Sequence, residues 1–136
     1  MPQARERARS LGGTRGALYA WRTINGEEAS AYFPAGTAQY HINADIAHTV
    51  KLYFDVTNDQ NFLREQGAAV VLETARFWLQ FGSWQQRDGR SQLCLYKVTG
   101  PAAYTDLVDN NYSKYRIAKV NMAFASWLFA KSSIAR

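Results

Sequence analysis

The side chains that could perform acid, base or metal chemistry are few in this 136-residue chain. The two histidines, His41 and His48, stand seven positions apart, whereas two metal ligands on one helix prefer a spacing of four and need a third ligand. We therefore expect no metal site, and we expect the histidines to pack in the core or to brace a loop. The single cysteine, Cys94, lies between two leucines in an expected strand, which predicts a buried, inert thiol.

One loop near the middle of the second half combines turn-forming residues with carboxyl groups. Gly100-Pro101 by itself indicates only a turn, because both residue types are common in turns. Asp106 and Asp109 follow, and a carboxyl group acts as a general acid only when burial brings its pKa near the working pH. The elements that hold this loop therefore matter as much as its own residues.

The hydrophobic pattern predicts helices on both sides of a long first loop. A helix over Gln3–Leu11 is expected to end at Gly12-Gly13. Residues 14–38 show no sustained period and are expected to form an ordered active-site loop. Apolar residues then recur every three to four positions, which predicts an amphipathic helix over Gln39–Val56.

The remaining pattern predicts two more helices and a hairpin. A short helix is expected next. Gly67 is expected to separate it from a following helix of about four turns, which carries Val71 and Leu79. Asp88-Gly89 between two short apolar runs predicts a β-hairpin over Ser83–Leu95. A loop over residues 97–111 leads to a last helix, about Ser113–Ala130, whose apolar residues lie on more than one face and predict burial all round.

Five segments stand out when these elements are placed in order. They are Trp21–Ser30 (WRTINGEEAS), Pro34–Ile46 (PAGTAQYHINADI), Glu73–Trp78 (ETARFW), Val98–Thr105 (VTGPAAYT) and Val108–Asn111 (VDNN). In this order they resemble motifs of glycoside hydrolase family 65, the maltose, trehalose and kojibiose phosphorylases. The resemblance implies a mainly α fold, in which antiparallel helix pairs form part of an (α/α)6 toroid with one short β-hairpin. Residues 1–136 would then be a single incomplete catalytic domain with exposed flanks.

The resemblance also places a catalytic position in the loop. The family loop reads V-T-G-P-D-E-Y, and its Glu, the general acid, corresponds to Ala103 here. In the family this acid protonates the glycosidic oxygen while phosphate attacks the anomeric carbon from the opposite face. Alanine has no proton to give, and a carboxylate three or six positions further along cannot reach the same place. We therefore expect no intact catalytic residue.

Binding roles follow from the same resemblance. The expected substrate-binding residues are Trp21, Glu27, Glu28 and His41, and the expected loop-bracing residues are Tyr104, Asn110 and Asn111. Tyr32 and Phe33 could also stack on a sugar ring. For Glu27 and Glu28 a solvated acidic turn is an equal alternative. No cofactor is implied; inorganic phosphate is the co-substrate, and its site belongs to barrel segments outside this sequence.

The resemblance predicts a segment of an inverting α-glucoside phosphorylase that is inactive as this chain, with a disaccharide and phosphate as partners. One alternative is a non-catalytic sugar-binding or scaffold segment. Another is a remnant of a family trehalose hydrolase, which the wording of Trp21–Glu28 disfavours.

Charge and composition narrow the remaining partners and the location. The net charge is +5 and the basic residues look dispersed along the sequence, so no nucleic-acid partner is expected. No apolar run approaches the 18 residues of a membrane span, and one cysteine fits a reducing cytoplasm. Similarity to the family already covers the arginines near the start, which predicts an interior helix and not a targeting extension. Exposed barrel flanks could support self-association.

Overall fold

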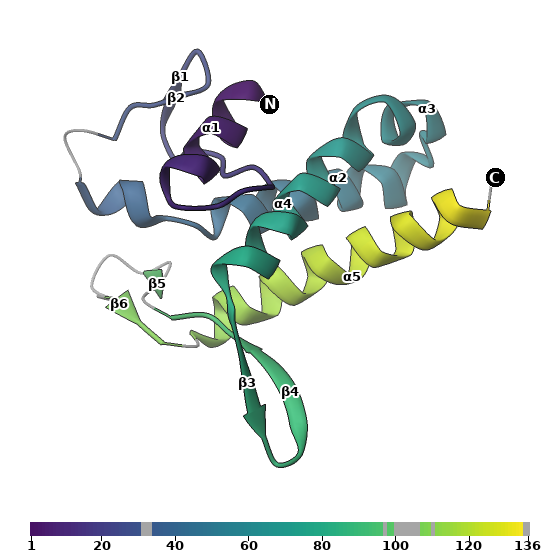
Figure 1. The fold of residues 1–136 in the computed structure, drawn as a ribbon. Coiled ribbons are helices and arrows are strands. Elements are labelled where there is room, and N and C mark those ends of the chain that lie inside the picture. The colour runs from purple at the N-terminus through teal and green to yellow at the C-terminus, as the bar shows by residue number, and fades with distance from the viewer. Residues whose placement is uncertain (31–33, 97, 100–106, 110, 135–136) are drawn as a thin grey trace.

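The computed structural model describes residues 1–30, 34–96, 98–99, 107–109 and 111–134. Its α-helices are α1 (Pro2–Ser10), α2 (Ile42–Thr57), α3 (Gln60–Phe62), α4 (Ala68–Phe81) and α5 (Tyr112–Ile134). α2, α4 and α5 pack against one another, and Figure 1 shows α4 running opposite to α2 and α5. The mainly α fold with antiparallel helices is therefore confirmed.

The helix before the hairpin is longer than expected, because Gly67 does not interrupt it. A π-helical turn, η2 (Leu63–Gly67), joins α3 to α4 in one helical stretch. Gly67 keeps helical dihedral angles, φ −61° and ψ −44°. A Cβ added there would lie 3.0 Å from Cγ1 of Val50 on α2, so the glycine allows close packing of two helices. The expected break at Gly67 was wrong.

The first long loop contains regular structure. Strands β1 (Thr23–Ile24) and β2 (Glu27–Glu28) form a small antiparallel pair, and a 3₁₀ helix, η1 (Pro34–Ala38), follows. Asn25 and Gly26 have φ of 53° and 82°, as a type I′ turn requires. An Asn-Gly pair is a strong hairpin signal, so this hairpin could have been predicted from the sequence.

The expected hairpin is confirmed, with β3 (Ser83–Arg87) paired to β4 (Arg90–Cys94). Asp88 and Gly89 form its turn with φ of 50° and 71°. Cys94 is a buried free thiol, as predicted. A third pair, β5 (Val98–Thr99) with β6 (Leu107–Val108), closes the base of the loop whose residues 100–106 lie outside the described part of the chain.

Two apolar clusters form the core. One centres on Phe77, the fully buried Trp78 and Leu95, and the other gathers residues of α2, α4 and α5 around Val71. The expectation that α5 is buried all round was wrong, since Phe129 is 65% exposed. α5 instead buries a single stripe. The stripe consists of Lys114, Ala118, Asn121, Phe124, Ala125 and Leu128. None of the helices among the described residues is both long enough and apolar enough to cross a bilayer.

Candidate functional site

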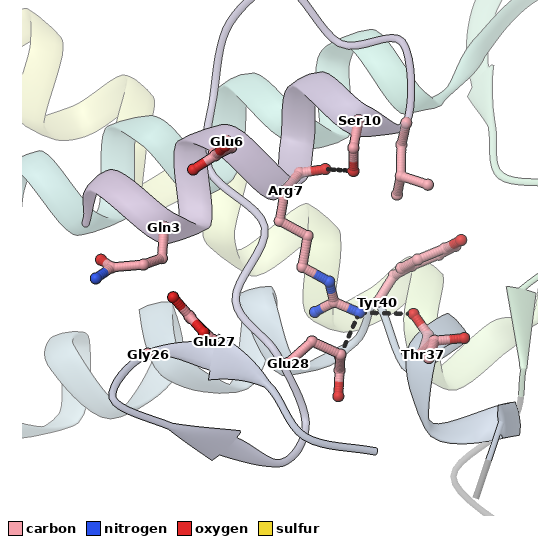
Figure 2. Close-up of a pocket in the computed structure, with 10 residues that line it drawn as sticks. Gln3, Glu6, Arg7, Ser10, Gly26, Glu27, Glu28, Thr37 and Tyr40 are labelled. Carbon is pink, nitrogen blue, oxygen red and sulfur yellow. Dashed lines mark hydrogen bonds and ion pairs between the residues drawn. The ribbon is translucent and has the colours of Figure 1, made fainter. Parts of the chain in front are cut away.

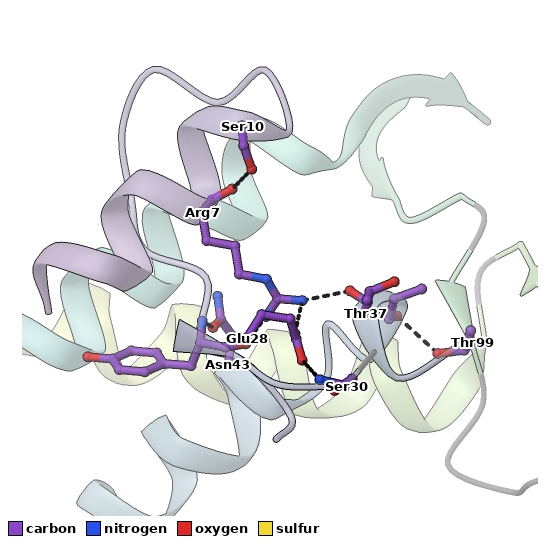
Figure 3. A network of polar contacts seen from close by, with 9 residues as sticks. Arg7, Ser10, Glu28, Ser30, Thr37, Asn43 and Thr99 are labelled. Carbon is purple, nitrogen blue, oxygen red and sulfur yellow. Dashed lines mark hydrogen bonds and ion pairs between the residues drawn. The ribbon is translucent and has the colours of Figure 1, made fainter. Parts of the chain in front are cut away.

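Side chains from α1 and from β5 form hydrogen bonds to the last two residues of η1 (Figure 3). Arg7 of α1 donates from Nη2 to the carbonyl of Thr37 at 2.7 Å, and the same nitrogen lies 2.7 Å from Oε2 of Glu28 on β2. On the other side, the hydroxyl of Thr99 donates to the carbonyl of Ala38 at 3.1 Å. One polar network therefore holds α1, the β1–β2 hairpin, η1 and the base of the loop at β5.

A buried asparagine fixes the segment that leads to Trp21. Asn43 of α2 is 0% exposed, and its Oδ1 accepts a hydrogen bond from the amide of Tyr19 at 2.8 Å. Its Nδ2 donates to the carbonyl of Ala17 at 2.7 Å. Because both amide atoms bind backbone groups, Asn43 holds the segment before the β1–β2 hairpin against α2.

The start of α5 presents a buried lysine to β5. Lys114 is 1% exposed, and its Nζ donates to Oγ1 of Thr99 at 3.3 Å. Burial lowers the pKa of Lys114 to about 8, and the carboxylate of Asp45 acts in the opposite direction. Asn111 caps this helix, since its Oδ1 accepts a hydrogen bond from the amide of Lys114 at 3.3 Å. Asn111 therefore stabilises the first turn of α5.

Trp21 lies over η1 with part of its ring in solvent. Trp21 is 41% exposed, and the guanidinium carbon of Arg22 lies 4.6 Å from the centre of its ring. A Cβ added to Gly36 would lie 2.7 Å from Cε3 of Trp21, so only glycine lets the indole lie this close to η1. The indole is therefore both anchored and partly accessible.

The two expected carboxylates differ in their surroundings (Figure 2). Both line a groove of about 550 Å³ between α1 and the β1–β2 hairpin. Glu28 is held by Arg7, and its Oε1 accepts a hydrogen bond from the amide of Ser30 at 2.9 Å. Glu27 is exposed. Glu28 thus has a structural partner on each oxygen, while Glu27 faces solvent at the groove.

His41 precedes α2 and is bound to its own neighbours. Its Nδ1 lies 2.6 Å from Oδ2 of Asp45, and its Nε2 lies 2.8 Å from Oε1 of Gln39. Both ring nitrogens are engaged, so a bound ligand would have to replace one of these contacts. No group of three or more His, Cys, Asp or Glu residues in the described part of the chain could hold a metal ion.

The structure brings Trp21, Glu27, Glu28 and His41 to the elements around η1. Ala103, Tyr104 and Asn110, like Tyr32 and Phe33, lie outside the described residues. The sequence interpretation missed Arg7, Thr37, Thr99 and Lys114. Lys114 lies one helical turn before Ala118, so the helical period places it on the buried face once that face is known from the structure.

Neighbouring helices packed antiparallel, as α2, α4 and α5 are, agree with a segment of a helical toroid. A solved structure described as a putative kojibiose phosphorylase from human microbiome superposes with a TM-score of 0.86 at 23% identity. The superposition covers 97% of this chain and 19% of that one. This likeness shows the fold.

The sequence comparisons show the family. Residues 1–134 match the glycosyl hydrolase family 65 central catalytic domain, and the chain belongs to this family. An α,α-trehalose phosphorylase of Thermoanaerobacter brockii is 54% identical over 123 residues, which are 90% of this chain and 16% of the relative. A second, from Geobacillus stearothermophilus, is 48% identical over 93% of this chain and 16% of its own length. The kojibiose phosphorylase of Escherichia coli K12 is 34% identical over 90% of this chain and 17% of its own.

Proposed function

We propose that this chain is a segment of the catalytic barrel of an inverting disaccharide phosphorylase of the trehalose or kojibiose type. The observation that carries the proposal is the family match over residues 1–134 together with relatives that are named phosphorylases. The chain spans 16% of the length of its trehalose phosphorylase relatives. Residues 1–136 then form one incomplete domain, and a disaccharide and phosphate are the partners of the complete barrel.

Within this proposal the polar network around η1 sets the position of the catalytic loop. The loop begins at Thr99, whose hydroxyl is fixed to Ala38 and to Lys114. Catalytic groups must be held to within a fraction of an ångström, so the base of the loop needs such a support. Tyr104 and Asn110 would brace the loop further along, beside the cap at Asn111.

We assign two kinds of role to the expected substrate-binding residues around η1. Trp21, with its partly exposed indole, and Glu27, with its exposed carboxylate, would contact sugar. Glu28 and His41 would instead position the surrounding elements, since their polar atoms already have partners.

We further propose that the 136 residues by themselves do not turn over disaccharide. Ala103 occupies the position of the general acid, and a general acid contributes about 10²- to 10⁴-fold. The groups that bind phosphate in the family belong to other barrel segments. Both deficiencies act on the chemical step, because positioning and proton transfer are needed together.

A graft tests the assignment of Ala103. Residues 14–112 would replace the corresponding segment of a complete trehalose phosphorylase, and glucose 1-phosphate formation would be measured. We expect an inactive chimera, and at least about a hundredfold recovery when Ala102→Asp and Ala103→Glu are both introduced. Ala102→Asp alone is the matched control and should restore nothing. If the unreverted chimera is as fast as the reverted one, Ala103 is not at the acid position.

The exposed apolar flank favours a second candidate, a non-catalytic scaffold. The exposed side chains of Val120 and Trp127 line a hollow between α2 and α5, next to Phe54, and the buried Phe124 forms part of its lining. Such a surface marks a site for another polypeptide or for a second copy of the chain. Size-exclusion chromatography with light scattering tests whether the partner is a second copy of the chain. A monomer at all concentrations argues against self-association. A remnant of a trehalose hydrolase is less favoured, because relatives at 54% and 48% identity are named trehalose phosphorylases, while relatives at 46% are named only uncharacterized glycosyl hydrolases.

A further inference from the structure

Four arginines that are spread along the sequence meet at one small pocket. Arg5 and Arg9 lie one turn apart on α1, Arg15 follows in the next loop, and Arg76 comes from α4. Together with Glu73 they line a hollow of about 190 Å³. The fold thus gathers four of the sixteen basic residues, which look dispersed in the sequence, at one place.

A glycine in the loop after α1 makes this convergence possible. Gly16 has φ of +91°, and a Cβ added there would lie 2.6 Å from the amide nitrogen of Phe77. The loop can therefore lie directly on α4. The amides of Thr14 and Arg15 both donate to Oε1 of Gln80, at 2.9 and 3.1 Å, which holds Arg15 over the same face.

The charges in the pocket are unbalanced. Oε1 of Glu73 lies 2.5 Å from Nη1 of Arg76 and 3.5 Å from Nη2 of Arg5, so one carboxylate serves two guanidinium groups. Arg9 and Arg15 are exposed, and neither has a carboxylate within ion-pair distance among the described residues. Glu6 lines the adjoining hollow with Arg5 and Arg9, without an ion pair to either among those residues. An anion with several oxygens would complete the site.

We propose that this pocket binds a phosphate group, either as inorganic phosphate or as the phosphate of a sugar monoester. The planar guanidinium fork matches phosphate oxygens in a bidentate manner, which a lysine cannot do. None of the residues that line the pocket is aromatic, so the pocket offers no stacking surface for the bases of a nucleic acid. It shares no lining residue with the groove between α1 and the hairpin, so the inference does not depend on the proposed function.

Isothermal titration calorimetry on the full chain tests the proposal. Inorganic phosphate and glucose 1-phosphate are titrated separately at constant ionic strength, against the same titration with chloride. We expect saturable binding of both phosphates and none of chloride. Equal affinities would show that the phosphate group alone is recognised, and tighter binding of the sugar phosphate would show that the sugar also contributes.

Variants locate the site. Arg9→Gln with Arg15→Gln should weaken binding by at least about tenfold, because charge-assisted bonds to the anion are lost. Thermal unfolding followed by circular dichroism should be unchanged, since these two side chains have no described ion pair to lose. Arg64→Gln is the matched control, because Arg64 has a 72% exposed side chain on η2 and should leave binding intact. Absence of saturable phosphate binding, or equal binding by the double variant, would overturn the proposal.

Discussion

Replacing Lys114 by methionine tests whether burying its charged amine beside Thr99 lowers the stability of the folded protein. The side chain is 1% exposed, and its one described hydrogen bond is to Thr99. Methionine is similar in length to lysine and uncharged, so it fills the same space without the cost of removing a charge from water. The replacement therefore isolates the electrostatic contribution of the ammonium group.

The magnitude follows from the lowered pKa. A pKa of about 8, against 10.5 for a free lysine, corresponds to about 3 kcal/mol of unfavourable free energy for the charged form in the folded protein. Loss of the bond to Thr99 offsets about 1 kcal/mol of this. We expect Lys114→Met to be more stable than the parent at neutral pH by about 1–2 kcal/mol.

The pH dependence has a defined sign. Between the two pKa values the unfolded chain holds one proton more than the folded chain, so the stability of the parent rises with pH in that window. From about pH 7 to about pH 9.5 the gain should be about 2 kcal/mol relative to the methionine variant. Below the folded pKa of about 8 both states carry the charge, so the difference should be nearly constant there.

Urea unfolding followed by tryptophan fluorescence measures this difference at each pH. Subtracting the variant from the parent cancels the titration of the other groups. Lys119→Met is the control, because it removes an exposed amine from the same helix. A parent-minus-variant difference that stays flat from neutral to alkaline pH would refute the argument that burial of Lys114 destabilises the charged form.

Two further substitutions test the supports of the first loop. Asn43→Ala leaves two backbone groups without their partner and should destabilise the chain by about 2–4 kcal/mol in urea unfolding, whereas Asn61→Ala at an exposed position should cost below about 0.5 kcal/mol. Equal costs would mean that the hydrogen bonds of Asn43 with the backbone of Ala17 and Tyr19 do not stabilise the fold. Gly16→Ala should cost about 1–3 kcal/mol more than Gly12→Ala, because both have positive φ but only Gly16 would place a Cβ against the backbone of Phe77. If thermal melts show the same loss for both, the close approach of loop and helix is not what makes glycine necessary.

Much of the fold could be predicted because its signals are local. The repeat of apolar residues identifies α2 and α4, and Asp88-Gly89 identifies the β3–β4 turn. The same rule applied to Asn25-Gly26 would have identified the β1–β2 hairpin. The break predicted at Gly67 was wrong. Glycine weakens an isolated helix, but here the absence of a Cβ lets the helix pack closely against Val50.

The candidate site was only partly predictable. The resemblance pointed to Trp21, Glu27, Glu28 and His41, and the fold places them around η1. Whether a carboxylate faces solvent or an arginine could not be predicted, because Arg7 lies 21 positions before Glu28 and no local pattern links them.

The sequence alone determined the helical periods, the turn at Asp88-Gly89, the order of the family motifs and the alanine at position 103. These features depend on residues a few positions apart, where backbone preference and side-chain period act directly. Only the tertiary structure decided that Lys114 is buried against Thr99 and that Arg15 and Arg76 share one pocket. Burial and charge pairing arise between segments tens of positions apart, and their free energy depends on the space and the dielectric that the packed elements create.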